Sequence, residues 1–287
     1  MSKIIDGKKL AHTILQEVQR RAMYIKDTYN IVPYIVSILV GYDHPSEIYL
    51  HMKMQTARKL GVIGKIIRFS KSITQIKLIH ELRRLNNNKI TGLLVQLPLP
   101  QHLNHNTILH NIDSNKDIDA VSVYHAGLLY NKQNFITSCT AQGIMYVLKY
   151  YLDKLTGKKV VVIGRSQIVG RPIAAMLLNE NCTVTQIHSK TRNIAKECHD
   201  ADIIIVAIGM PKFLQAHWVK KGCFVIDVGI NKEEGFMVGD THFKDLLAKV
   251  SYITPVPGGV GPLTVAFLLL NTLKLCYIHN RLDWNEY

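Results

Sequence analysis

Short apolar runs alternate with segments of helical periodicity along most of the chain. A strand of a parallel sheet is covered on both faces, so it reads as a continuous apolar run, and alternation of such runs with helices is typical of α/β folds. We therefore predict an α/β protein with parallel strands. The predicted strands are 35–41, 65–69, 91–97, 159–164, 183–188, 202–209 and 224–229, and the predicted helices are 46–60, 73–86, 141–152, 169–179 and 264–275.

One polar stretch interrupts this alternation, and the pattern then starts again. Residues 104–134 show neither helical nor strand periodicity, so we predict an irregular region there. After the turn at Thr156-Gly157-Lys158, strands and helices alternate as before. A chain of 287 residues is long enough for two ordinary domains. We expect two α/β domains with a boundary near 138–157.

The composition is that of a globular protein, with 47% hydrophobic residues. No apolar run reaches the roughly 18 residues that a membrane helix needs, the nearest being 263–270. The N-terminus lacks the apolar core and cleavage site of a secretory signal, so we expect a cytoplasmic enzyme and no membrane partner. The five cysteines are widely spaced and form no close pair, so we interpret them as isolated buried thiols and expect no metal site.

The net charge of +14 is the one unusual bulk property. Lysine and arginine are scattered, and no basic run interleaves with aromatic residues as in a nucleic-acid-binding stripe. We therefore expect no nucleic-acid partner. A positive field would still attract an anionic substrate or cofactor.

The segment that follows the predicted strand 159–164 has the features of a dinucleotide-binding turn. Gly164 allows a sharp turn, Ser166 is small enough for a phosphate to approach, and Gly170 allows the next helix to pack on the strand. Free amides at the helix start would face a pyrophosphate. The second glycine of the usual motif is replaced by Ser166 and the third is displaced, so a plain tight turn is the alternative. The strand–turn–helix context favours a nicotinamide cofactor.

The end of the second strand indicates which cofactor binds. An NAD site usually has an acidic residue there for the ribose 2′-hydroxyl. The segment 188–192 contains no acidic residue. Arg165 and Ser189 could instead bind a 2′-phosphate, so we predict NADP. Lys190 and Arg192 fit a solvated loop equally well.

A second group of residues lies outside this region. Tyr49 and Lys53 are four apart in a predicted helix and so share a face. When desolvated, such a pair can handle protons, because burial lowers a lysine's pKa toward neutrality; an exposed Lys beside a packed Tyr is the commoner outcome. Gln96 ends a buried strand where side chains line the ligand crevice of α/β sheets. Asp119 lies in a loop that no helix or strand pattern explains.

Glycines and prolines cluster at residues 255–262. Repeated glycine between prolines gives a rigid backbone without side chains, which suits the close approach of a flat ligand. A structural loop that closes the domain is an equally good interpretation of this pattern.

These motifs together resemble the bifunctional methylenetetrahydrofolate dehydrogenase/methenyltetrahydrofolate cyclohydrolase family from about Ile4 to Thr272. The match rests on five ordered motifs. They are Val40-Gly41 with Ser46-Glu47-Ile48-Tyr49-Leu50-His51-Met52-Lys53, Gly92-Leu93-Leu94-Val95-Gln96-Leu97-Pro98-Leu99-Pro100, Lys116-Asp117-Ile118-Asp119, Gly164-Arg165-Ser166, and 255–264.

The resemblance implies two reactions of one-carbon folate metabolism. A hydride passes to NADP from the methylene carbon that bridges N5 and N10 of tetrahydrofolate, and water then opens the methenyl ring to give 10-formyltetrahydrofolate. The resemblance also implies homodimers and a cleft between a folate-binding domain, 1–138 plus 264–287, and an NADP-binding Rossmann domain, 139–263.

The resemblance implies a role for each matching residue. Lys53 would handle the proton of the attacking water, and Gln96 would hydrogen-bond Lys53 and hold it in a useful protonation state. Tyr49 would orient the folate and Asp119 would hold the pterin ring. The folate site would be lined by Val95, Gln96, Leu97, Pro257, Gly258 and Gly261, and NADP would be held by Gly164, Arg165, Ser166, Ser189 and Ile230.

Two segments depart from the family pattern. Ala120 to His125 replaces a run that commonly starts with glycine, and Ser138-Cys139-Thr140-Ala141 lacks two prolines, which softens the start of the next helix. Neither change removes a residue that performs chemistry. Two alternatives remain: a dehydrogenase with a single activity that uses NAD or NADP, and a non-catalytic protein that binds a dinucleotide or nucleic acid.

Overall fold

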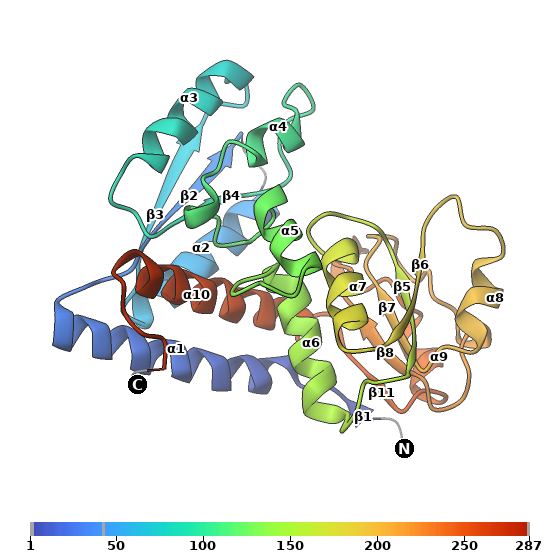
Figure 1. Cartoon of the computed structure of the whole chain (residues 1–287). Helices are drawn as coiled ribbons and strands as arrows, with labels where there is room; N and C mark the ends of the chain where they lie inside the picture. The colour runs from blue at the N-terminus through green and yellow to red at the C-terminus, as the bar shows by residue number, and fades with distance from the viewer. Residues whose placement is uncertain (1–2, 42–43, 286–287) are drawn as a thin grey trace. The chain divides into compact units, whose positions relative to one another are not determined.

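The computed structural model describes residues 3–41 and 44–285 of the chain (Figure 1). These residues form two compact units. The first unit comprises the described residues of 1–12, 129–132 and 138–267. The second unit comprises those of 13–128, 133–137 and 268–287. Each unit is built around its own parallel sheet, which confirms the predicted α/β class.

The second unit contains a three-stranded sheet of order β3-β2-β4. The central strand β2 (Tyr34–Val40) pairs in parallel with β3 (Ile63–Phe69) and β4 (Gly92–Val95). Six of the seven residues of β2 are buried, as expected of a strand with neighbours on both edges. The connecting helices are α2 (His44–Lys59) and α3 (Gln75–Asn86). These strands and helices lie where the sequence pattern places them.

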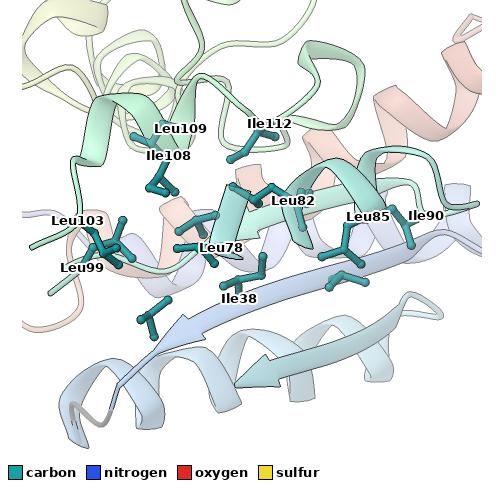
Figure 2. Close-up of a cluster of buried hydrophobic side chains, with 14 residues drawn as sticks. Ile38, Leu78, Leu82, Leu85, Ile90, Leu99, Leu103, Ile108, Leu109 and Ile112 are labelled. Atoms are coloured by element: carbon teal, nitrogen blue, oxygen red, sulfur yellow. The ribbon is translucent and has the colours of Figure 1, made fainter. Parts of the chain in front are cut away.

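The apolar face of α3 supplies one core of this unit. Leu78, Leu82 and Leu85 are spaced for one helix face and are fully or almost fully buried. Figure 2 shows these side chains gathered with Ile38 of β2 and with apolar residues of the segment that follows β4. Burial of a leucine side chain contributes about 2 kcal/mol, so this cluster fixes α3 on the sheet.

A long helix that the sequence analysis did not predict lies near the N-terminus. Helix α1 (Gly7–Tyr29) has 23 residues. Its buried hydrophobic residues recur every three or four positions, which is the spacing of one helix face. They are Leu10, Ala11, Ile14, Val18, Ala22 and Ile25.

The prediction that residues 104–134 are irregular is wrong in part. This stretch contains α4 (His105–Leu109), the 3-10 turn η1 (Ser114–Lys116) and α5 (Val123–Tyr130). Helix α4 has five residues, too few for a periodic pattern, and its start is marked by Asn104, whose side chain accepts a hydrogen bond from the amide of Thr107.

The first unit contains a six-stranded parallel sheet of order β1-β11-β8-β7-β5-β6. The strands are β1 (Lys3–Ile4), β5 (Lys159–Ile163), β6 (Thr183–Ile187), β7 (Ile203–Val206), β8 (Phe224–Asp227) and β11 (Tyr252–Ile253). Strand β5 lies between β6 and β7, so the chain leaves β5 first to one side and then to the other. This reversal is the point at which open α/β sheets bind ligands, beyond the carboxyl ends of the strands.

The remaining elements of this unit connect or extend the sheet. They are α6 (Cys139–Tyr151), α7 (Gly170–Asn179), α8 (Ile194–His199), η2 (Ala216–Trp218), the hairpin β9 (Asn231–Glu233) with β10 (Phe236–Val238), and α9 (Phe243–Leu247). Helix α6 begins without a side-chain cap, since the hydroxyl of Ser138 donates instead to the carbonyl of Ile168.

The last helix, α10 (Val260–His279), begins four residues before the predicted start, so part of the glycine–proline cluster is helical. Pro262 lies in its first turn, where the missing N–H has no intrahelical partner to lose. By length and composition alone α10 could cross a membrane, because an 18-residue window of it has a mean hydropathy of 1.5, although its continuous apolar run is shorter. Since 61% of that window is buried within the protein, α10 has the character of a core helix.

Candidate active site

Helix α2 presents Tyr49 and Lys53 on one face, as their spacing predicts. The Nζ atom of Lys53 lies 4.4 Å from the centroid of the Tyr49 ring and donates a hydrogen bond to Oε1 of Gln96 at 3.2 Å. The Lys53 residue is only 7% exposed. A lysine amine is therefore largely withdrawn from water and held between an aromatic face and an amide oxygen, an arrangement suited to exchanging a proton with a bound molecule.

The Gln96 side chain is fixed by its surroundings. Its backbone amide donates to the carbonyl of Ile38 at 2.9 Å, which continues the pairing of β4 with β2 by one residue. Its side-chain Nε2 donates to the carbonyl of Leu97 at 2.7 Å. This bond sets the amide orientation, so Oε1 is the atom directed to Lys53. Val95, immediately before, is buried, and Leu97 is half-buried.

Two residues of the Lys116-Asp117-Ile118-Asp119 motif, Lys116 and Asp117, bond to other parts of the protein. The Nζ atom of Lys116 donates to the carbonyls of Asn86 and Asn88 at the end of α3, and burial lowers the pKa of this lysine. The carboxylate of Asp117 accepts the Ser122 amide at 2.7 Å. Burial is the main cause that raises the pKa of Asp117. Both residues therefore hold the loop in place.

Asp119 is half-buried. A parallel bridge between Leu93 and Asp117 places the segment beside β4, running the same way. Asp119 and Gln96 therefore both lie toward the carboxyl end of β4. The buried side chain of Asn271 donates to the carbonyl of Ile118 at 3.0 Å and steadies the turn.

The first departure from the family pattern falls in a strained backbone position. Ala120 adopts φ of 51°, in the left-handed region that favours glycine. The turn persists because the Ser122 amide is bound to Asp117 and α5 begins directly afterwards at Val123. The substitution thus changes local strain next to Asp119 without removing a polar group.

The turn after β5 has the backbone that was predicted. Gly164 adopts φ of 127°, and a Cβ at this position would lie 2.4 Å from the carbonyl oxygen of Ala207. A Cβ on Gly170 would lie 2.4 Å from the carbonyl oxygen of Gly164. Both positions therefore require glycine, the first for the turn and the second for packing of α7 against it.

Ser166 has a role that the sequence did not reveal. Its Oγ accepts the amides of Val169 and Gly170, each at 3.2 Å, and its carbonyl accepts the amide of Arg171 at 3.0 Å. The expectation that the amides at the start of α7 are free is therefore wrong for these three residues. Because the Ser166 oxygen already accepts two bonds, its hydroxyl hydrogen is available to an anion. Ser166 and Arg165 are both exposed.

The ends of β5 and β6 are adjacent, since these strands pair along their whole length. The Gly164 amide donates to the carbonyl of Ile187 at 2.9 Å, so the turn that carries Arg165 lies beside the end of β6. Ser189 follows β6 in a tight turn, in which the Thr191 amide donates to the carbonyl of His188. Arg165 and Ser189 thus come from neighbouring strand ends, and both are exposed.

Two buried aspartates that the sequence analysis missed are Asp227, the last residue of β8, and Asp240, which follows β10. Ile230 follows β8 and is 58% exposed, whereas Asp227 and Asp240 are at most 2% exposed. In the sequence, the feature that could have indicated these residues is an aspartate close to a glycine in Asp227-Val228-Gly229 and again in Gly239-Asp240. The contacts between the two segments depend on the fold.

The glycine cluster at 257–261 makes close backbone contacts with the start of α1. The Gly7 amide donates to the carbonyl of Gly258 at 3.0 Å, and a Cβ on Gly7 would lie 1.8 Å from the carbonyl oxygen of Gly259. This contact explains why residue 7 lacks a side chain, and a Cβ on Gly259 would itself lie 2.5 Å from the carbonyl oxygen of Pro255. Pro257 is exposed, and a Cβ on Gly261 would meet no atom within 4 Å.

Comparison with known proteins identifies the family. The catalytic-domain model of the tetrahydrofolate dehydrogenase/cyclohydrolase family matches residues 5–119, and its NAD(P)-binding-domain model matches residues 138–280. The chain belongs to this family. Its membership confirms the expected catalytic and NAD(P)-binding domains and the identity of the chain as a bifunctional dehydrogenase/cyclohydrolase. It does not favour the alternative with a single activity.

Relatives match this family member over almost its whole length. The bifunctional protein FolD of Streptococcus thermophilus is 45% identical over 96% of this chain and 97% of its own. The FolD structure from Campylobacter jejuni has a TM-score of 0.93 and 40% identity, covering 98% of this chain and 100% of that one. The Trypanosoma brucei FolD, solved with NADP cofactor and inhibitor, has a TM-score of 0.93 and 35% identity, covering 98% and 99%.

Proposed function

We propose that this chain oxidises 5,10-methylenetetrahydrofolate to 5,10-methenyltetrahydrofolate with NADP and then hydrolyses the product to 10-formyltetrahydrofolate. Family membership supports the pair of reactions. The observation that carries the proposal at the level of residues is the buried amine of Lys53 on Oε1 of Gln96. The proton-transfer group of a hydrolase needs such placement, whereas a module that only binds a cofactor does not.

The residues of the β5 turn fit a dinucleotide that carries a 2′-phosphate. Gly164 and Gly170 keep side chains out of the turn, and the Ser166 hydroxyl can donate to a phosphate. Arg165 and Ser189 project from neighbouring strand ends, where a 2′-phosphate needs cations and donors. When bound, NADP accepts the hydride. Ile230 would contact the same cofactor beyond β8. The relative solved with NADP supports this assignment.

The second unit would bind and orient the folate. Tyr49 would pack against the folate and Asp119 would hold its pterin ring. The backbone of Val95 to Leu97 would line the same site at the end of β4. Pro257, Gly258 and Gly261 would contribute further backbone surface to the folate. Hydride transfer depends mainly on alignment of the two carbons, so these binding residues would serve both reactions.

Hydrolysis makes a separate demand. Water adds to the methenyl carbon, the bond between that carbon and N5 opens, and one proton is released overall. The Nζ atom of Lys53 would take the proton of the water, and Gln96 would keep the amine in place and in a useful protonation state. Lys53 would therefore contribute more to hydrolysis than to hydride transfer.

The assembly and location are part of the same proposal. The folate-binding domain would comprise 1–138 and 264–287, and the NADP-binding domain 139–263. The family resemblance supports a homodimer, which size-exclusion chromatography with light scattering would detect as twice the mass of the chain. Five free, buried cysteines suit a reducing compartment, so we propose a cytoplasmic location.

One spectrophotometric assay tests the proposed function. The purified protein is given methylenetetrahydrofolate with NADP or, in parallel, with NAD, while reduced cofactor and methenyltetrahydrofolate are followed separately. We expect reduction of NADP in preference to NAD, with methenyltetrahydrofolate consumed faster than in buffer. Accumulation of methenyltetrahydrofolate at the rate of cofactor reduction would show a dehydrogenase with a single activity. Preference for NAD would overturn the role given to Arg165 and Ser189.

A further inference from the structure

Two buried carboxylates organise the loops at the carboxyl ends of β7 and β8. Asp240 is fully buried and Asp227 is 2% exposed. Burying a carboxylate is costly unless hydrogen bonds replace its water, so the bonds of these two side chains show what the fold uses them for.

Asp240 binds two different loops at once. Its Oδ2 accepts the backbone amides of Ile208 at 2.8 Å and Gly209 at 3.0 Å, both in the turn that follows β7. Its Oδ1 accepts Nδ2 of Asn231 at 2.8 Å. Asn231 is the first residue of β9 and comes directly after Ile230, the last residue of the loop that follows β8. All three donors are neutral, and together they hold the two loops at a fixed separation.

Asp227 binds the backbone of Asp240 and of the residues near it. Its Oδ1 accepts the amides of Gly229 at 3.1 Å and Asp240 at 2.9 Å. Its Oδ2 accepts the amide of Thr241 at 2.9 Å and the hydroxyl of Thr241 at 2.6 Å. Ile230 is therefore flanked by one residue bound to Asp227 and another bound to Asp240.

Glycine next to each carboxylate makes this arrangement possible. A Cβ on Gly229 would lie 2.0 Å from Oδ1 of Asp240, and a Cβ on Gly239 would lie 2.0 Å from Oδ2 of Asp227. No side chain fits at either position without displacing a carboxylate. The glycines and the aspartates thus form one packed group beneath the two loops.

The position of this group relates it to one half of the cofactor. In a sheet of this kind the pyrophosphate binds at the turn after the first strand, here β5, and the adenosine ribose at the end of the next, here β6. The nicotinamide half then extends to the other side of β5, over β7 and β8. The turn after β7 touches the β5 turn, since a Cβ on Gly164 would lie 3.5 Å from Cγ2 of Ile208.

We propose that Asp240 is a positioning residue for the nicotinamide half of the cofactor. Its carboxylate fixes the turn after β7 and, through Asn231, the loop that carries Ile230. The proposal rests on the proposed NADP function of this unit. Asp240 itself is buried beneath the loops, so it acts through Ile208, Gly209 and Asn231.

The affinities for two ligands, compared in the same variants, distinguish a positioning role of Asp240 from a general role in stability. Titration calorimetry measures the affinity for NADP and for adenosine 2′,5′-bisphosphate, which carries the adenosine half alone. In Asn231→Ala, one hydrogen bond to the carboxylate is lost. We expect NADP to bind about tenfold more weakly, as loss of one bond to a charged group implies, and the bisphosphate to bind within about twofold of wild type. Asp240→Asn places an amide donor against backbone amides, so we expect this variant to lose at least as much NADP affinity as Asn231→Ala.

Asn179→Ala is the matched control. Asn179 is also half-buried in the first unit and also loses one hydrogen bond, from its Nδ2 to the carbonyl of Leu129 at 2.9 Å. It ends α7, away from the carboxyl ends of the strands. We expect this variant to bind both ligands as wild type does.

Two results would overturn the inference. One is equal weakening of NADP and of the bisphosphate in Asn231→Ala, which would indicate a general loss of structure. The other is NADP affinity in Asn231→Ala and Asp240→Asn equal to that of Asn179→Ala. Failure of the proposed function looks different, because the wild-type protein itself would then bind neither ligand.

Discussion

The Nζ atom of Lys53 lies 3.2 Å from Oε1 of Gln96, and the Gln96 amide cannot turn away without losing its bond to the carbonyl of Leu97. A neutral acceptor therefore faces a buried amine. A carboxylate in the same place would favour the charged form of the amine, which cannot accept a proton. The choice of glutamine over glutamate thus bears directly on the proposed hydrolysis.

Gln96→Glu should move the pH profile of the cyclohydrolase to higher pH. The new carboxylate favours protonated Lys53, so more alkaline solution is needed to free the amine, and we expect a shift of about one pH unit or more. At neutral pH the cyclohydrolase rate should fall while substrate still binds. Gln101→Glu, at an exposed position of the same unit, is the control and should leave the profile unchanged. An unshifted profile in Gln96→Glu would contradict the role of Gln96.

Gly164→Ala should destabilise the protein far more than Gly157→Ala. Both glycines have positive φ, 127° and 77°, so each substitution strains the backbone by about 1–2 kcal/mol. Only at Gly164 does the new methyl group also meet a carbonyl oxygen, at 2.4 Å, whereas at Gly157 nothing lies within 4 Å. We expect a loss of about 3 kcal/mol or more for Gly164→Ala. Urea denaturation of the two variants measures the difference, and equal losses would show that the turn has room for a side chain.

Asp117→Asn should alter how stability depends on pH. Burial is the main cause that raises the pKa of Asp117, and Asp119 acts in the same direction against the Ser122 amide and His125. A carboxyl whose pKa is raised by folding stabilises the protein below its ordinary value of 3.8, and this contribution is lost as pH rises through the folded value. Asparagine does not ionise, so the stability of Asp117→Asn relative to wild type should increase from about pH 3.5 to pH 7. A pH-independent difference in the free energy of unfolding would refute this.

The cysteines should be unreactive in the native protein. All five are free and buried, and burial raises the pKa of Cys198 and of Cys223 to about 12 and that of Cys276 to about 11. The reactive thiolate is therefore scarce as well as inaccessible at neutral pH. We expect Ellman's reagent to react slowly with folded protein and to titrate five thiols after denaturation. Rapid modification of even one thiol under native conditions would contradict this picture.

The strands could be predicted because buried strands have continuous apolar sequences. Val160 to Ile163 form a β-branched run, and the structure buries all four residues in β5, between β7 and β6. Helix α1 could also have been predicted, since Leu10, Ile14 and Val18 follow helical spacing. The hairpin β9–β10 could not, because each of its strands has only three residues, too few for a periodic pattern.

Only part of the candidate site could be predicted from the sequence. The shared face of Tyr49 and Lys53 follows from helical geometry, and Gly164 and Gly170 follow from the needs of a tight turn. The contacts of Ser166 and Asp240 depend on where distant backbone amides lie, which no local pattern specifies. A side chain that binds loops of two different strands can be identified only once those strands are placed.

The most direct test of the account compares both activities in purified Lys53→Ala. Because positioned acid–base catalysis contributes about a hundredfold or more, we expect the cyclohydrolase rate to fall by at least that much while NADP-dependent dehydrogenase activity stays measurable. Lys59→Ala, an exposed lysine at the end of the same helix, should keep both activities. Equal retention of both activities in Lys53→Ala would contradict the assignment of the hydrolytic step to this amine.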